Sequence, residues 1–200
     1  MHNDELLTLE HVRKSLFRLI DKTPYLDWLL LTKRPENIHK MWHGGPRPNI
    51  WLGTSVENQE YANIRIPRLL GSRKLSPVLF LSCEPMVGPV DLRRVEFDAH
   101  TSQNVLFSFK TSIHKTNAID WVIAGGESGP QARPAQIGWF RSLRDQCAEA
   151  NKAFLFKQWG EFDDTMTRVG KRVAGRKLDG RTHDSVPILM KRPEVVGYDS

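Results

Sequence analysis

The sequence has few cysteines and no hydrophobic segment long enough to span a membrane. Its 200 residues include two cysteines, Cys83 and Cys147, and neither a CxxC pair nor a histidine-rich cluster. A metal site built from closely spaced ligands is therefore excluded, and we assign no metal-binding residue. No apolar run approaches the roughly 20 residues that a bilayer requires. We expect a protein without membrane association.

The first residues also lack the layout of a secretory signal. They read MHNDE and are acidic, whereas a signal peptide begins with basic and then apolar residues. We expect a cytoplasmic protein. The composition, 40% hydrophobic and 26% charged, is typical of a globular chain.

Positive charge exceeds negative charge, with a net value of +6. Clustered basic side chains gain affinity for phosphates by releasing counterions, so a nucleic-acid partner is one interpretation. The alternative is a solvated basic surface without such a partner. The densest basic stretch lies near the end of the chain, and its candidate nucleic-acid-binding residues are Arg168, Lys171, Arg172, Arg176, Lys177 and Arg181.

Apolar periodicity predicts a first helix and then five strands. Leu6, Leu9, Val12, Leu16 and Leu19 recur at helical spacing. The predicted strands are Trp28–Thr32, Ile50–Ser55, Val78–Ser82, Trp121–Ala124 and Ala153–Phe156. Both alternating faces of these runs are mostly apolar, which is typical of parallel strands buried on two sides. Helical or turn-rich stretches separate the strands, as in βαβ units.

These elements predict an α/β fold, an incomplete parallel (β/α) barrel of about five strands with a small C-terminal β extension. The partial barrel would span residues 1–160, with residues 95–117 as an inserted loop or hairpin. Residues 161–200 would form the basic extension, in which Gly170, Gly175 and Gly180 recur every five residues. A barrel without its first strands exposes a strand edge, so we expect self-association through that edge.

Polar residues follow every predicted strand. Right-handed crossovers bring the carboxyl ends of parallel strands to one edge, where ligands bind in such folds. The candidate ligand-binding residues are Lys33, Arg34, Ser55, Glu57, Glu84, Gly125, Gly126, Glu127, Ser128, Lys157 and Gln158. Their repetition at five strand ends predicts a polar ligand site. The alternative is a set of loop charges that pair with one another, and we assign no catalytic residue.

The glycine-rich stretch Gly125–Gly129 is the most informative motif. Glycines after a strand let a ligand approach the backbone closely. The stretch matches neither a dinucleotide fingerprint nor a phosphate loop, so nucleoside triphosphate hydrolysis is disfavoured.

Five motifs taken in order resemble a known family. They are LTKRPE from Leu31, WLGTSVEN from Trp51, LSCEP from Leu81, GGESG from Gly125 and FKQWG from Phe156. Together they resemble the phage-associated family of unknown function named after bacteriophage gene products thirty-seven and sixty-eight. The resemblance covers roughly residues 28–187, including GRKLDGR from Gly175.

The resemblance implies a radical S-adenosylmethionine barrel whose N-terminal cysteines hold an iron–sulfur cluster. It also implies that Gly125, Gly126 and Glu127 contact the amino group of S-adenosylmethionine. This sequence starts after the segment that carries those cysteines, so Met1 is expected to be an internal start, or the chain a degraded relative. Cys83 and Cys147 cannot supply three cluster ligands. No cofactor is therefore demonstrable in this chain, and we expect ligand binding without turnover.

The alternative function is that of a non-enzymatic, nucleic-acid-binding phage accessory protein. Such a protein would bind through the basic tail, and its affinity would fall steeply with salt. An S-adenosylmethionine binder would be nearly indifferent to salt and would lose binding on Glu127→Ala.

Overall fold

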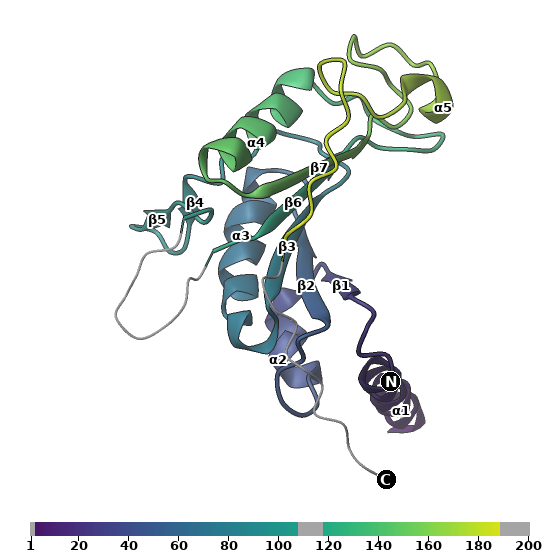
Figure 1. The fold of residues 1–200 in the computed structure, drawn as a ribbon, viewed down its shortest axis with the longest axis vertical. Helices are drawn as coiled ribbons and strands as arrows, with labels where there is room; N and C mark the ends of the chain where they lie inside the picture. The colour runs from purple at the N-terminus through teal and green to yellow at the C-terminus, as the bar shows by residue number, and fades with distance from the viewer. Residues whose placement is uncertain (1–2, 108–117, 189–200) are drawn as a thin grey trace.

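The computed structural model describes residues 3–107 and 118–188, with side chains from residue 9 onward. Its centre is a five-stranded sheet in the order β1-β2-β3-β6-β7, and every neighbouring pair is parallel (Figure 1). The strands are β1 (Trp28–Thr32), β2 (Ile50–Ser55), β3 (Val78–Cys83), β6 (Trp121–Gly125) and β7 (Ala153–Gln158). All five match the strands predicted from the sequence, to within two residues.

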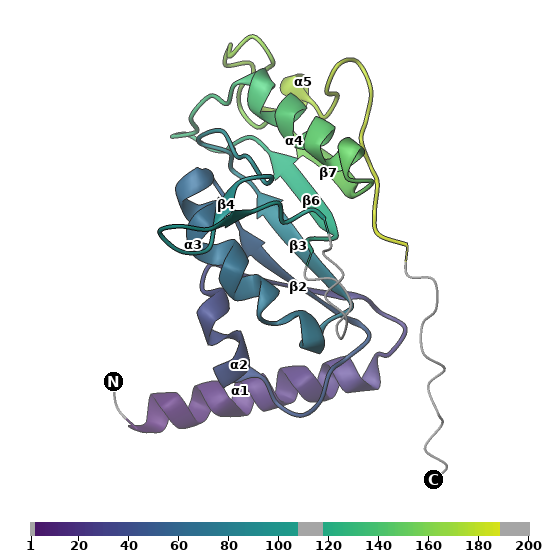
Figure 2. The ribbon, with the colours of Figure 1, turned by 90° about the vertical axis from the view of Figure 1, so that its left-hand side faces the viewer.

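The sheet is open: the predicted α/β class and the five parallel strands are confirmed, and closure into a barrel is not shown. Closure requires the two outermost strands to pair, and β1 and β7 each have one strand neighbour within the described part of the chain. The strands nevertheless follow chain order, and right-handed crossovers then place successive helices on the same face. Figure 2 shows α3 (Gln59–Leu70) and α4 (Ile137–Glu149) on one side of the sheet.

The main hydrophobic core lies between this sheet face and the helices. Ile66 and Leu69 of α3 and Phe140 and Leu143 of α4 are fully buried in it. The start of α3 is fixed by Asn58, whose side-chain oxygen accepts a hydrogen bond from the Tyr61 amide at 3.0 Å. Three further helical turns are short: η1 (Pro35–Asn37), α2 (Ile38–Met41) and η2 (Arg73–Leu75).

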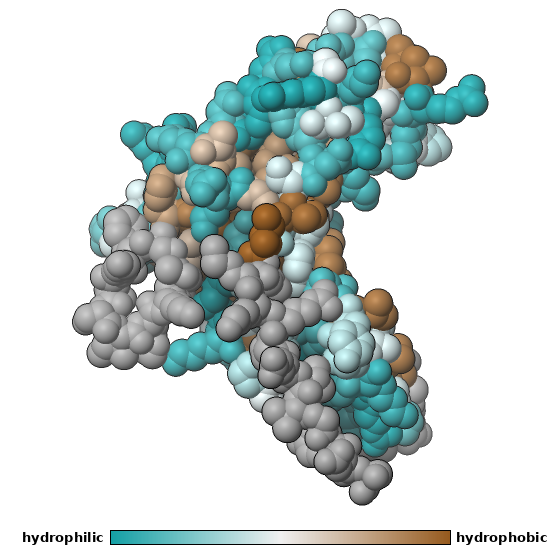
Figure 3. All heavy atoms as spheres, in the orientation of Figure 1, coloured by the Kyte–Doolittle hydropathy of each residue, from teal (hydrophilic) through white to brown (hydrophobic). Residues whose placement is uncertain are grey.

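The opposite sheet face carries a second, smaller apolar cluster. Its buried members are Trp51, Val78, Phe80 and Trp121. Gly53 lies under this cluster, since a Cβ atom there would overlap the Phe80 ring. Figure 3 shows hydrophobic residues gathered in the hollowed middle of the molecule, between its more polar upper and lower parts.

Strand β1 is less buried than the sequence predicted. Leu29 and Leu31 are 46% and 51% exposed, whereas β2 and β3 are buried along their whole length. The difference arises because β1 is an edge strand, which pairs only with β2 among the described strands. Self-association through this edge stays a prediction.

The first helix, α1 (Asn3–Lys22), confirms the helical periodicity, but only part of its apolar stripe is buried. Phe17 and Ile20 join the core, whereas Leu9, Val12 and Leu19 are about half exposed. Among the described residues, no helix is long and apolar enough to cross a membrane.

The predicted insertion contains a short antiparallel pair, β4 (Val95–Glu96) with β5 (Ser102–Gln103). Residues 108–117 of the insertion lie outside the described residues. The described part of the predicted C-terminal β extension forms isolated antiparallel bridges and the one-turn helix α5 (Lys171–Ala174). Gly170, Gly175 and Gly180 all have positive φ, so the chain turns too often to build a continuous ladder.

Candidate functional site

Four of the predicted site residues meet around the carboxylate of Glu84, directly after β3. Lys157 Nζ lies 3.0 Å from Glu84 Oε2, and Gln158 Nε2 donates to Glu84 Oε1 at 2.9 Å. The same Gln158 nitrogen lies 3.2 Å from Ser128 Oγ. The Glu84 side chain is 17% exposed and the Lys157 side chain 57%. A largely buried carboxylate therefore faces an ammonium group that reaches solvent.

Strand order explains why residues from three distant segments meet there. β6 lies between β3 and β7, and a register shift at its end pairs Gly125 with Gln158. Backbone hydrogen bonds then connect the loops: Met86 N donates to Gly125 O at 3.1 Å, and Gly126 N donates to Gln158 O at 2.9 Å. We call Glu84, Ser128, Lys157 and Gln158 the Glu84 group. Its members follow or end strands whose carboxyl ends are connected by backbone hydrogen bonds.

The two glycines after β6 make room for groups of the protein itself. A Cβ atom on Gly125 would lie 3.2 Å from the Glu84 carboxyl group. A Cβ atom on Gly126 would overlap the carbonyl oxygen of Trp159. Close packing therefore explains glycine at both positions, and ligand contact by either one stays a prediction.

A second carboxylate, Glu57, lies at the end of β2. Lys33 Nζ lies 3.0 Å from Glu57 Oε1, and Arg65 Nη1 of α3 lies 2.7 Å from Oε2. Burial works to raise the pKa of Glu57, but the Lys33 hydrogen bond and the Arg65 charge outweigh it, so this pKa is lowered. Arg65 was not among the predicted site residues, because it lies in the middle of a helix pattern.

Arg65 is also held from two other directions. Its Nη1 atom donates to the Ser55 carbonyl at 2.9 Å, and its guanidinium lies 4.0 Å from the centre of the Tyr61 ring. The predicted residue Ser55 takes part through this carbonyl, and its side chain is buried. We call Lys33, Glu57 and Arg65 the Glu57 group. Through Arg65 this group connects the end of β2 to α3.

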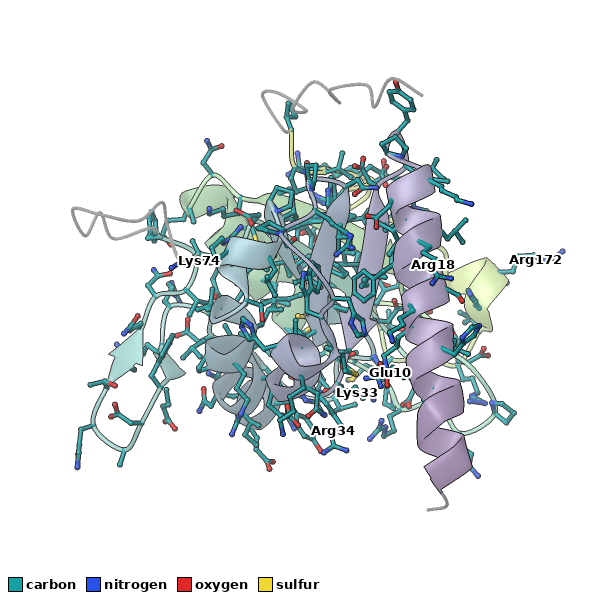
Figure 4. The ribbon with its side chains drawn as sticks, turned by 90° about the horizontal axis from the view of Figure 1, so that it is seen from below. Glu10, Arg18, Lys33, Arg34, Lys74 and Arg172 are labelled. Carbon is teal, nitrogen blue, oxygen red and sulfur yellow. The ribbon has the colours of Figure 1, made fainter. Side chains whose placement is uncertain are left out.

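Glu127 is separate from both groups and binds Arg133. The guanidinium donates to both carboxylate oxygens, at 2.7 and 3.0 Å, and the Arg133 amide donates at 3.0 Å. These hydrogen bonds lower the pKa of Glu127. Arg34 pairs with Glu36 at the surface, and Figure 4 shows Lys33 and Arg34 on the same side of the molecule.

Some cations of the basic tail are bound by other groups of the protein, and others are not. Arg168 donates to the carbonyl oxygens of Gly129 and Pro130, and Arg176 pairs with Asp184. Lys171 and Arg172 make no side-chain hydrogen bond or ion pair with any described residue. Arg172 points away from the ribbon (Figure 4). Lys177 and Arg181 are exposed.

Neither cysteine fits an iron–sulfur cluster. Cys83 and Cys147 are fully buried in the main core. Burial raises the pKa of both thiols, that of Cys147 to about 12, whereas a cluster ligand must be a thiolate. In residues 3–107 and 118–188, no group of three or more His, Cys, Asp and Glu side chains could hold a metal ion.

Comparison with known proteins places the chain in a family. A family model described as "Protein of unknown function (DUF5131)" matches residues 4–187. No curated protein and no solved structure matches the chain. The match covers nearly the whole sequence and every residue of the Glu84 and Glu57 groups. The chain therefore belongs to the DUF5131 family of proteins of unknown function.

Proposed function

We propose that the chain binds a small polar ligand at the carboxyl edge of its sheet. In this proposal it is the C-terminal, ligand-binding part of a radical S-adenosylmethionine-like protein of phage association. The assignment to that enzyme class, and the phage association, rest on the resemblance of the ordered motifs. The geometry supports ligand binding at Glu84 in particular.

One observation carries the proposal. The Glu84 carboxylate is fixed by Gln158 from β7, and its other oxygen is paired with the solvent-reaching Lys157 ammonium. An ion pair of this kind, with one partner more than half exposed, contributes little to stability. A ligand with an ammonium or hydroxyl group can replace Lys157 at Glu84, and its own anionic group can bind the released lysine.

The carboxylate of Glu84 and the ammonium group of Lys157 complement the charged groups of S-adenosylmethionine. Its ammonium and hydroxyl groups would bind to Glu84, and its carboxylate would bind to Lys157. Glu127, at the position that the resemblance favours for the amino group, would first have to exchange its contacts with Arg133. When bound, S-adenosylmethionine supplies an activated sulfonium centre, while the residues of this chain hold and orient the molecule.

The iron–sulfur cluster does not fit the residues of this chain, since both cysteines are buried in the core. Reductive cleavage would therefore require cluster ligands from outside this chain. The proposed activity of the chain itself is binding.

The test is calorimetric titration of S-adenosylmethionine into the wild type and Glu84→Gln. Losing a charge-assisted contact, worth about 1.5–3 kcal/mol, should weaken binding by about tenfold or more. Glu96→Gln is the matched control, because Glu96 lies on β4, and it should bind like the wild type. Equal affinities for Glu84→Gln and the wild type would contradict the proposal. Titration of Glu127→Ala under the same conditions shows which of the two carboxylates, Glu84 or Glu127, binds the amino group of the ligand.

The second candidate is nucleic-acid binding through the basic tail. The unpaired cations Lys171 and Arg172 favour it, whereas the internal contacts of Arg168 and Arg176 do not. A nucleic-acid binder should lose affinity steeply as salt rises, and a binder of a small zwitterion should not.

A further inference from the structure

A pocket with only cationic, amide and glycine residues in its lining lies between the end of β7 and the tail. Its volume is about 470 Å³, within the range of ligand pockets. The lining residues are Lys157, Gln158, Lys171, Arg172, Gly175 and Arg176. No carboxylate takes part in the lining, and four of its six residues carry a positive charge.

The four cations of the pocket are only partly neutralised. Lys157 pairs with Glu84 and Arg176 with Asp184, and both acids lie outside the lining. Lys171 and Arg172 have no acidic partner among the described residues. The positive charges of Lys171 and Arg172 are therefore not neutralised by an ion pair. Together they balance the negative charge of a phosphate monoester near neutral pH, which is about −1.5 to −2.

The backbone gathers these side chains into one pocket. Gly170 and Gly175 bracket α5 and have φ values of 83° and 70°. The Trp159 amide donates to the Gly175 carbonyl at 3.0 Å, which joins the end of β7 to the turn after α5. Lys171 and Arg176 thus come to lie beside Lys157, although the sequence separates them by more than a dozen residues.

We propose that this pocket binds the phosphate group of a small phosphorylated ligand. Arginine presents a planar pair of donors that matches phosphate oxygens, and lysine adds a point charge. The volume exceeds that of inorganic phosphate, so the rest of the ligand would occupy part of the pocket as well. This site goes beyond the proposed S-adenosylmethionine site, because that ligand has no phosphate.

The two sites share Lys157 and are therefore coupled. A phosphate in the pocket competes with Glu84 for the Lys157 ammonium. Phosphate binding would free one Glu84 oxygen to accept a hydrogen bond from a ligand at the carboxyl edge. The pocket can nevertheless bind phosphate whether or not the carboxyl-edge proposal holds.

The experiment titrates adenosine 5′-monophosphate into the full chain by calorimetry, with adenosine as the ligand without phosphate. We expect the nucleotide to bind and adenosine not to bind. The double variant Lys171→Gln/Arg172→Gln should bind the nucleotide about tenfold more weakly or worse, because it loses two charge-assisted contacts. Both residues are exposed, so its thermal unfolding should match that of the wild type.

The matched control is Arg18→Gln/Lys74→Gln, which removes the same two charges at exposed positions on α1 and η2 (Figure 4). It should bind the nucleotide like the wild type. Equal weakening by both double variants would overturn the proposal, as would equal binding of nucleotide and adenosine.

A ten-residue oligothymidylate distinguishes a small ligand from nucleic acid. The proposal expects the nucleotide to bind with a shallow salt dependence. Oligothymidylate binding that falls steeply with salt, without nucleotide binding, would overturn it. Glu84→Gln should bind the nucleotide at least as well as the wild type, so a failed carboxyl-edge site and a failed phosphate pocket give different results.

Discussion

Replacing Glu57 with glutamine tests whether the carboxyl edge is held by a buried ion pair. Glu57 is 7% exposed and contacts Lys33 and Arg65, whose side chains are 65% and 11% exposed. Removing one partner of a buried pair costs about 3–5 kcal/mol. The cost should be smaller here, because Arg65 keeps the Ser55 carbonyl and glutamine keeps an acceptor oxygen. We expect Glu57→Gln to lower the free energy of unfolding by about 2 kcal/mol.

The measurement is urea denaturation of the wild type and Glu57→Gln at pH 7. Glu36→Gln is the matched control, because Glu36 pairs with Arg34 where both side chains are exposed, and it should leave the free energy of unfolding close to that of the wild type. A similar loss in both variants would refute the reasoning, as would wild-type stability in Glu57→Gln.

The pH dependence of the free energy of unfolding tests the role of Glu57 independently. The pKa of Glu57 in the folded protein lies below its usual value of 4.5. Glu57 therefore binds a proton more readily in the unfolded chain than in the folded one, and its ion pairs stabilise the fold above pH 4.5. This stabilisation is lost as the pH falls through the folded pKa, so Glu57→Gln should have a shallower loss of stability in acid.

Two further predictions concern packing and the attachment of the tail. Gly53→Ala should lower the free energy of unfolding by about 1–3 kcal/mol, because its Cβ would overlap the Phe80 ring. Gly45→Ala is the control, because a Cβ on Gly45 meets nothing within 4 Å, and its melting temperature should be close to that of the wild type. Equal melting temperatures for Gly53→Ala and Gly45→Ala would contradict the close contact between Gly53 and Phe80. Hydrogen bonds from two arginines of α4 lower the pKa of Asp179 to about 2, so this contact should persist as the pH falls through 3.8 and be lost near 2. An NMR titration of the Asp179 carboxyl group checks this, and a midpoint near 3.8 would be inconsistent with the contact.

Much of the fold was predictable from local sequence. The five strands were found because each is a short apolar run ending in a polar or glycine-rich turn, and α1 because its leucines recur at helical spacing. Even the convergence of Glu84, Ser128, Lys157 and Gln158 followed from parallel topology, which brings the carboxyl ends of strands together.

The partners of individual charges were not predictable from local sequence. Arg65 and Arg133 bind Glu57 and Glu127 from a helix and a loop, and nothing in their local sequence distinguishes them from surface arginines. The packing of Gly125 and Gly126 against Glu84 and Trp159 was not predictable either, and the ligand contact predicted for these glycines stays a prediction. These contacts depend on strand register, which the sequence does not encode residue by residue.

The sequence by itself determined the α/β class, the parallel strands and the polar character of the carboxyl edge, because these depend on periodicity and chain order. Only the tertiary structure decided that Leu29 and Leu31 are exposed, and that Lys157 and Arg176 line one pocket. Those features depend on which segments become neighbours in space. Neighbours in space are chosen by packing of the whole chain, which no local pattern contains.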